Sequence, residues 1–402
     1  MNNNLTKLHL YPFERLNELL KGLEYQANLP LISFAVGEPK HPAPAFLIEL
    51  MKDKDFIRQG FGSYPPTKGL PELRLAISAF LGRRYHLRSE PDADHQVLPV
   101  NGSREALFSF AQALLDPTDY PTTIMPNPFY QIYEGAALLA GSRPYYVNNE
   151  ADTGLPDFDS IPESIWQDCQ LLYLCTPGNP SGAVISSEAL DKLIDRSKAF
   201  DFVIASDECY SEIYADESSP PPGLLEIADR KGCNDYKNCI VFNSLSKRSN
   251  IPGVRSGYVA GDADLLERFL LYRTYHGSAM PVHHQLISAA AWQDEAHVVI
   301  NRQAYRQKFM KVTQILGAVW PTVTPDATFY LWPETPIDDQ LFTQRVFQHT
   351  NIKILPGSFL SRETTLANPG KNRVRIALVA SESECAQAAQ RIVQAWPKLT
   401  GS

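Results

Sequence analysis

This 402-residue chain lacks several features that would place it in particular classes of protein. Its six cysteines (Cys169, Cys175, Cys209, Cys233, Cys239 and Cys385) show no CxxC spacing, so we expect free, buried thiols in a reducing cytosol rather than a disulfide scaffold. No run approaches the roughly 18 apolar residues of a membrane span. The first ten residues are polar and contain no apolar core, so no secretory signal peptide is expected and the sequence predicts a cytoplasmic protein.

The chain also lacks an excess of positive charge, internal repeats and a GxGxxG motif. It has 37 Lys and Arg against 45 Asp and Glu, a net charge of −8, which argues weakly against a nucleic-acid partner. No GxGxxG follows any expected strand, which counts against a nicotinamide dehydrogenase on a doubly wound sheet. The 44% hydrophobic content and the length fit an ordinary globular protein with a large core and two domains.

What the sequence does contain is a series of short apolar segments that alternate with helical patterns. The expected strands are 96–100, 122–125, 143–147, 171–175, 201–205, 239–242 and 258–260. Apolar strands without alternation, separated by helices, predict a parallel sheet covered on both faces. From about Asp294 the pattern changes to a long helix at 296–320, short strands within 328–332, 352–356 and 374–379, and a final helix at 382–395, which predicts a smaller α+β unit.

A polar loop follows the strand at 239–242 and carries Ser244, Ser246, Lys247 and, further on, Arg255. A lysine in such a loop can form a Schiff base with a carbonyl. The hydroxyls and the guanidinium could hold a phosphate beside it, and the combination suggests pyridoxal phosphate. The alternative is that Lys247 and Arg248 are solvated loop charges.

Other polar motifs follow neighbouring strands. Asn101-Gly102-Ser103 begins a helix, where free N–H groups suit a phosphate, although a simple helix cap is the alternative. Tyr130 could cover a flat ring, although aromatic residues are more often core. Asn179, Asp207 and Tyr210 also follow strand ends. Because ligands bind beyond the carboxyl ends of the strands in open α/β sheets, these motifs predict one site.

The order of these motifs resembles that of class I/II aminotransferases. Asn179-Pro180-Ser181-Gly182 is followed by Asp207-x-x-Tyr210, by Ser244-x-x-Lys247 and by Arg255 eight residues after the lysine. The resemblance covers roughly 30–380 and implies the pyridoxal phosphate-dependent fold type I. That fold is α/β, with a mostly parallel seven-stranded sheet sandwiched by helices in a large domain, here 44–294. A smaller α+β domain would comprise 1–43 and 295–402.

The resemblance also implies roles for the residues around the cofactor ring. Lys247 is similar to the lysine that carries the cofactor and later moves a proton. Asp207 resembles the carboxylate that pairs with the pyridine nitrogen. Asn179 and Tyr210 resemble the residues that hydrogen-bond the ring O3′, and Tyr130 resembles the stacking aromatic.

The residues that the resemblance assigns to the phosphate are Gly102, Ser103, Arg104, Ser244 and Arg255, and Ser246 is expected among the cofactor-binding residues. Tyr64 resembles a tyrosine that reaches across a homodimer interface to the partner's phosphate. Arg375 resembles the arginine that binds the substrate α-carboxylate, with Arg373 as a rival on the same strand, and Gly37 resembles a glycine near that carboxylate.

Within the family, four segments look most like bacterial N-succinyldiaminopimelate aminotransferases: 11–14, 37–44, 100–108 and 127–136. This resemblance implies amino transfer between glutamate/2-oxoglutarate and N-succinyl-2-amino-6-oxopimelate, a step towards lysine and diaminopimelate. Lys40, His41 and Arg104 are candidates for the distal carboxylates of the substrate, or else surface and phosphate-site groups.

The alternatives are an aminotransferase for aspartate, alanine or aromatic amino acids, a lyase or decarboxylase on the same fold, and a non-catalytic regulatory module. No metal site is expected. Cys209 is interpreted as a small core residue rather than a nucleophile.

Overall fold

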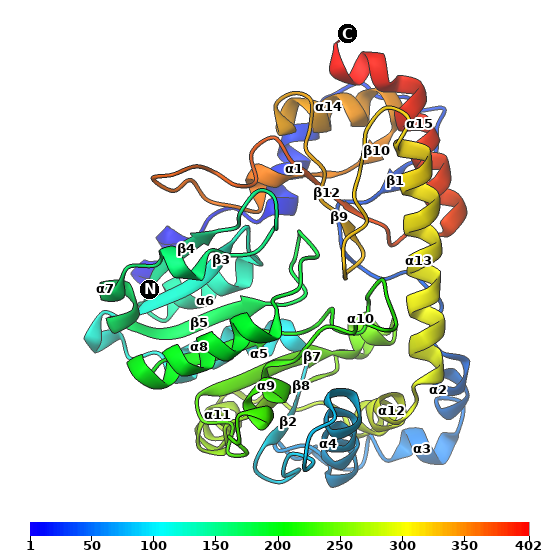
Figure 1. The fold of residues 1–402 in the computed structure, drawn as a ribbon. Helices are drawn as coiled ribbons and strands as arrows, with labels where there is room; N and C mark the ends of the chain where they lie inside the picture. Colours follow the sequence, from blue (N-terminus) through cyan, green and yellow to red (C-terminus); the bar gives the residue numbers. More distant parts are fainter. Residues whose placement is uncertain (402) are drawn as a thin grey trace.

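The computed structural model describes residues 1–401 and is built around a seven-stranded sheet (Figure 1). The strands are β2 (Val97–Val100), β3 (Thr122–Asn127), β4 (Arg143–Asn148), β5 (Cys169–Cys175), β6 (Val203–Asp207), β7 (Cys239–Ser244) and β8 (Gly257–Gly261). Their order is β2-β8-β7-β6-β5-β3-β4, and only β8 runs antiparallel to its neighbours. The predicted mostly parallel seven-stranded sheet is confirmed.

Helices cover both faces of this sheet. One face packs against α4 (Pro71–Tyr85), α8 (Ser187–Phe200), α9 (Leu224–Arg230) and α12 (Val282–Gln293), and the other against α5 (Ser103–Leu114), α6 (Gln131–Leu139) and α11 (Ala263–His276). Along β5, Leu172 and Leu174 enter the first core while Leu171 and Tyr173 enter the second. Alternate side chains of a strand point to opposite faces, so a strand buried on both faces reads as a continuous apolar run.

A second, smaller group of elements surrounds its own core. Three helices form most of it: α13 (Ala296–Leu316), α14 (Asp339–Thr350) and α15 (Glu382–Thr400). With them lie a three-stranded sheet of β11 (Leu355–Pro356), β12 (Val374–Ala377) and β9 (Tyr330–Leu331), and a parallel pair of β1 (Ile32–Ser33) and β10 (Ile352–Lys353). Through that pair the N-terminal strand joins the C-terminal part of the chain, as the sequence-based domain division implies; its boundaries remain a prediction.

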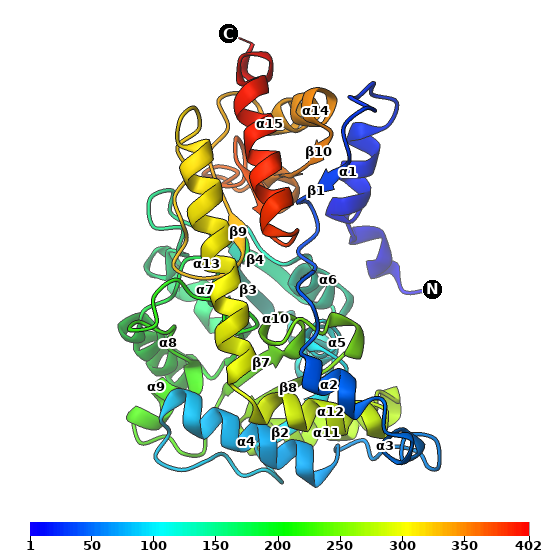
Figure 2. The same cartoon turned by 90° about the vertical axis from the view of Figure 1, so that its right-hand side faces the viewer.

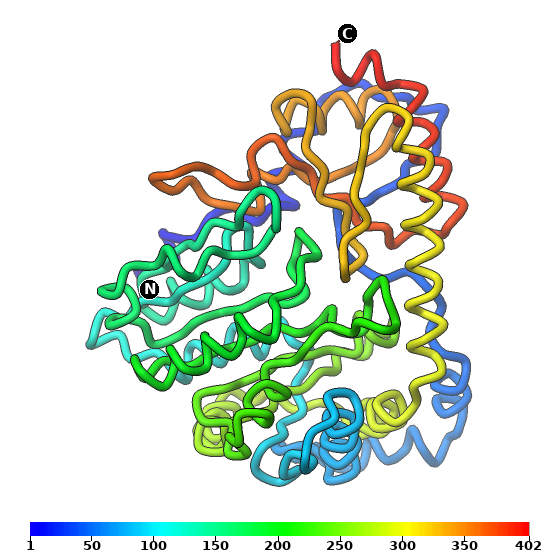
Figure 3. Tube along the Cα trace, in the orientation of Figure 1, coloured from blue at the N-terminus to red at the C-terminus, as the bar shows by residue number. Residues whose placement is uncertain are grey.

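The remaining elements are short or peripheral. The α-helices are α1 (Pro12–Leu20), α2 (Ala45–Leu50), α3 (Lys54–Arg58), α7 (Glu163–Gln167) and α10 (Leu245–Arg248). Short 3-10 turns occur at Asn3–Lys7, Pro117–Asp119, Phe158–Ser160, Pro252–Val254 and Gly357–Phe359. Figure 2 shows α1 against the small group, and Figure 3 traces the segment that leads from β1 down to α2. Among residues 1–401, no helix combines the length and the apolar character of a membrane span.

Two helix ends differ from the sequence-based expectation. The long helix ends at Leu316 rather than at 320, because Gly317 follows and Trp320 turns back into the small core. The final helix was expected to stop at 395 but continues to Thr400 through Pro397. Leu399 is fully buried, so packing of this last turn outweighs the hydrogen bond that the proline cannot donate.

Candidate active site

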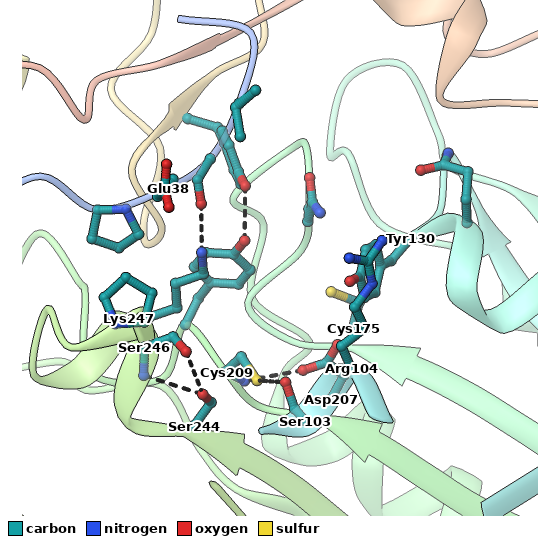
Figure 4. A pocket seen from close by; sticks show the side chains of 18 of the residues that line it. Glu38, Ser103, Arg104, Tyr130, Cys175, Asp207, Cys209, Ser244, Ser246 and Lys247 are labelled. Atoms are coloured by element: carbon teal, nitrogen blue, oxygen red, sulfur yellow. Dashed lines mark hydrogen bonds between the residues drawn. The ribbon is translucent and has the colours of Figure 1, made fainter. Parts of the chain in front are cut away.

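A cavity of about 390 Å³ opens beyond the carboxyl ends of β5, β6 and β7, between the large sheet and the small group (Figure 4). Most of the residues singled out from the sequence line it: Gly37, Ser103, Arg104, Tyr130, Asn179, Asp207, Tyr210, Ser244, Ser246, Lys247, Arg255 and Arg375. They come from segments more than three hundred residues apart in the chain. The topology therefore brings the expected polar groups to one place.

Lys247 lies on the one-turn helix α10, directly after β7. Its Nζ donates a hydrogen bond to Gly37 O at 2.5 Å and lies 5.1 Å from the centre of the Phe329 ring. Withdrawal from water lowers the pKa of Lys247 to about 8, and the nearby Arg375 guanidinium acts in the same direction. An amine with a lowered pKa is more often neutral, which is the form that attacks a carbonyl.

Asp207 is the last residue of β6 and is almost fully buried. Its carboxylate accepts hydrogen bonds from the Tyr133 hydroxyl at 2.7 Å and from the Cys209 backbone N–H at 3.2 Å. Burial raises its pKa, and these two donors oppose the shift. Such a carboxylate would be stabilised by a cationic partner, as a protonated ring nitrogen would provide. Tyr133 was not identified from the sequence, because no neighbouring residue in the chain indicates that its hydroxyl reaches Asp207.

Another part of the cavity wall is rich in hydrogen-bond donors. α5 begins at Ser103, directly after Gly102. The φ of Gly102 is 83°, which is strained for residues with a side chain, and a Cβ at this position would lie 2.6 Å from Arg255 Nη2. Ser244 caps α10 and its hydroxyl lies 2.9 Å from that of Ser246. A guanidinium, hydroxyls and a helix N-terminus together form a donor set that fits a phosphate.

Arg375, on β12, is buried in the wall of the cavity. It donates to Asn179 Oδ1 at 3.0 Å and to Ala35 O at 2.8 Å, it lies 4.5 Å from the centre of the Tyr330 ring, and its Nε is buried without a partner. The rival Arg373 does not line the cavity. It pairs instead with Glu334 at 2.7 Å, away from the other site residues.

Two tyrosines link the large sheet to the small group. The hydroxyls of Tyr210 and Tyr330 are 2.8 Å apart, and Asn179 beside them contacts Arg375. At Gly37 an added Cβ would overlap the Tyr330 hydroxyl, so the close approach of this segment to the cavity requires glycine.

The structure leaves some sequence-based candidates outside the cavity. Tyr64 is fully exposed, and neither Lys40 nor His41 lines the cavity. The interpretation of Cys209 as core filler was incomplete, because Cys209 lines the cavity and its thiol lies 3.0 Å from the Ser103 hydroxyl. Sequence reasoning gave no role to the cavity residues Tyr11, Glu38, Gln131, Cys175 and Tyr330, since their positions depend on long-range packing.

Comparison with known proteins identifies the family. The model for "Aminotransferase class I and II" matches residues 30–392. The chain belongs to this family. The family, fold class and enzyme class expected from the sequence are therefore confirmed: the protein is an aminotransferase of fold type I. Members of the family use pyridoxal phosphate, act on amino and keto acids and are typically dimeric.

Individual relatives agree with this assignment over nearly the full length. The LL-diaminopimelate aminotransferase of Nitratidesulfovibrio vulgaris is 30% identical over 372 residues, covering 91% of this chain and 92% of the relative. An aminotransferase structure from Neisseria meningitidis has a TM-score of 0.93 and 46% identity, covering 98% and 99% of the two chains. One from Helicobacter pylori has a TM-score of 0.87 and 32% identity, covering 96% and 98%.

Proposed function

We propose that this aminotransferase holds pyridoxal phosphate in the cavity at the carboxyl ends of β5 to β7. The observation that carries the proposal is that Lys247, Asp207 and Arg375 face one cavity with a donor-rich end. When bound, the cofactor supplies a carbonyl that links to amines and a ring that withdraws electrons.

The protein's own side chains would bind the substrate, hold the ring and move a proton. Arg375 would grip the substrate α-carboxylate, for which its Nε is still unpaired. Asp207 would hold the ring nitrogen in its protonated form. Once the substrate amine has displaced Lys247, the freed Nζ would move a proton from the substrate Cα to the cofactor carbon. Asn179 and Tyr210 would hydrogen-bond the ring oxygen, and Tyr130 would stack on the ring.

For the phosphate, Gly102, Ser103, Arg104, Ser244, Ser246 and Arg255 would provide donors, the first three partly through backbone N–H groups. Tyr64 would come from the partner subunit of a homodimer, because in its own subunit it reaches none of these groups. The active unit would then contain two shared sites.

For the substrates, we propose glutamate/2-oxoglutarate with N-succinyl-LL-2,6-diaminopimelate and its 6-oxo counterpart. Of the three candidates for the distal carboxylates, only Arg104 lines the cavity, where it donates to the Tyr11 hydroxyl at 3.0 Å. Free LL-diaminopimelate is the second candidate, because curated relatives 28–30% identical are named LL-diaminopimelate aminotransferases. The two substrates differ in whether the distal amine carries a succinyl group.

A substrate panel tests this choice. The purified holoenzyme is incubated with 2-oxoglutarate and, in separate reactions, the succinylated substrate, free LL-diaminopimelate, aspartate, alanine and phenylalanine, and glutamate formation is measured. We expect the highest kcat/KM with the succinylated substrate. A higher value with the free diamine would replace the first candidate by the second. No stoichiometric 2-oxoglutarate from glutamate alone would contradict transamination and leave the lyase.

Lys247→Ala tests the cofactor link. The variant should still bind pyridoxal phosphate through the phosphate end but should lack the absorbance of the lysine-linked cofactor, and borohydride should no longer fix the cofactor to the chain. Arg248→Ala would not be a matched control, because Arg248 is buried in the core; Lys40→Ala, an exposed lysine, serves instead. Retention of the linkage in Lys247→Ala would mean that another lysine carries the cofactor.

A further inference from the structure

Behind Lys247 lies a buried amide that the sequence did not single out. Asn301, on α13, is 4% exposed and makes four hydrogen bonds. Its Nδ2 donates to the carbonyls of Lys247 at 3.1 Å and Arg248 at 3.3 Å. These carbonyls end the one-turn helix α10 and have no partner further along that helix. Asn301 thus completes the hydrogen bonding of the element that carries the lysine.

The oxygen of the Asn301 amide binds the segment whose Gly37 carbonyl accepts the hydrogen bond from Lys247. Its Oδ1 accepts from His41 Nδ1 at 2.8 Å and from Asn250 Nδ2 at 2.6 Å. The His41 ring packs on Tyr305, also on α13, at 4.5 Å between ring centres. His41 follows Gly37 by four residues, and Gly37 O receives the hydrogen bond from Lys247 Nζ.

These contacts connect the backbone and the amine of Lys247 through Asn301 and His41. The backbone of Lys247 is held by Asn301, Asn301 holds His41, and the segment from His41 back to Gly37 holds the amine of Lys247. Only an amide at position 301 can donate to two carbonyls and accept from two N–H groups at once. Burial and the nearby Lys308 lower the pKa of His41, which favours its neutral form, and in the tautomer with the proton on Nδ1 that ring donates to Asn301 Oδ1.

We propose that Asn301, together with His41, is a positioning pair that sets where the amine of Lys247 stands relative to the cofactor carbon. The proposal rests on the proposed role of Lys247. It gives His41 a function other than binding the distal end of the substrate. Removing the pair would let α10 and the 37–41 segment shift independently, and a displacement of the lysine by an ångström would slow proton transfer more than it would weaken substrate binding.

Asn301→Leu, which keeps the branched shape of the side chain but has no polar groups, tests the amide. In the holoenzyme with glutamate and 2-oxoglutarate, we expect kcat to fall by about tenfold to a hundredfold, with a much smaller change in KM. The spectrophotometric pKa of the lysine-linked cofactor should shift as well. Arg302→Met is the matched control: Arg302 is the next residue on α13, equally buried, and pairs with Glu217 rather than with α10. It should lower thermal stability but leave the cofactor pKa unchanged.

A second pair of variants keeps the test decisive if Asn301→Leu does not fold. His41→Asn keeps a donor near the position of Nδ1 and should preserve most of the kcat, whereas His41→Phe keeps the ring packing and should lose it. Equal kcat and equal cofactor pKa in His41→Phe and wild type would overturn the proposal. So would a loss of thermal stability without a change in cofactor pKa. Absence of the lysine-linked absorbance from the wild-type protein would instead contradict the proposed function.

Discussion

Arg375 lies on β12 and Arg373 directly precedes that strand, yet the two arginines have different surroundings. Arg373 forms an ion pair with Glu334, whose side chain is 74% exposed, and lies away from the cavity. Arg375 is 4% exposed, contacts only neutral acceptors, and retains an unpaired Nε. A buried guanidinium without an anionic partner is expensive to maintain, which suits a group whose partner arrives with the substrate.

Arg375→Ala should therefore weaken the binding of every α-carboxylate substrate by about 2–5 kcal/mol, because the carboxylate would be left buried without its charged partner. Dissociation constants for glutamate and 2-oxoglutarate, from titration of the cofactor absorbance, measure the effect. Arg373→Ala is the control and should change these constants little. The reverse pattern would assign the carboxylate to Arg373.

At the scale of secondary-structure elements, Glu208 connects β6, α9 and α4 on the side of the sheet opposite Asp207. It follows β6, accepts the backbone N–H of Leu224 at the start of α9 at 2.8 Å, and accepts the hydroxyl of Tyr85 on α4 at 3.0 Å. Asp207 and Glu208 therefore face opposite sides, as expected for consecutive residues leaving a strand. Burial raises the pKa of Glu208 to about 7 despite these donors.

This raised pKa predicts a pH dependence of stability. Between the unfolded pKa of about 4.5 and the folded pKa of about 7, the folded protein binds more protons at Glu208 than the unfolded chain does. The stabilisation of the folded state by Glu208 is therefore fully present below pH 4.5 and is lost as pH rises through 7, a change of about 3 kcal/mol in the free energy of unfolding.

Glu208→Gln should remove this contribution to the pH dependence. The difference in unfolding free energy between wild type and variant, from urea titrations between pH 4.5 and 8, should change by about 3 kcal/mol in favour of the variant at high pH. Tyr85→Phe removes a donor that lowers the pKa of Glu208, so in this variant the pH range over which the Glu208 contribution is lost should extend to higher pH. A difference that is constant with pH would contradict a titrating Glu208.

At the scale of the whole molecule, the cavity is formed within one chain except for one expected contribution. Tyr64 is 100% exposed and belongs to the segment after α3, where Phe61 is also 79% exposed. Exposed aromatic residues are enriched at protein–protein interfaces. This arrangement supports the proposed homodimer, in which Tyr64 would donate a hydrogen bond to the partner's phosphate.

Mixed dimers test the shared site. Tyr64→Phe should weaken cofactor binding by about 1.5–3 kcal/mol, the range for a hydrogen bond to a charged group. A dimer of one Tyr64→Phe chain and one Lys247→Ala chain should contain one site with neither defect, because Tyr64 and Lys247 of each site come from different chains. Refolded mixtures should regain activity at low cofactor concentration. If Tyr64 served its own chain, no mixed site would be free of defects and activity would stay low.

The sequence by itself determined the sheet, the family and most of the cavity wall. Apolar runs such as 171–175 identify strands buried on both faces, because the hydrophobic pattern depends only on local burial. Motifs with a fixed spacing, such as Asp207-x-x-Tyr210, indicate the chemistry of a site, because residues only a few positions apart in the chain lie close together in space. Their convergence followed from the rule that parallel strands end at the same edge.

Tertiary structure decided the contacts that join distant segments. The different surroundings of Arg373 and Arg375 depend on Glu334 and Asn179, and the proposed role of His41 depends on Asn301, 260 residues away. No local pattern encodes such pairs, because their side chains meet only after the small group has packed on the large sheet. The same holds for Tyr133, on α6, whose hydroxyl reaches the Asp207 carboxylate only in the folded chain.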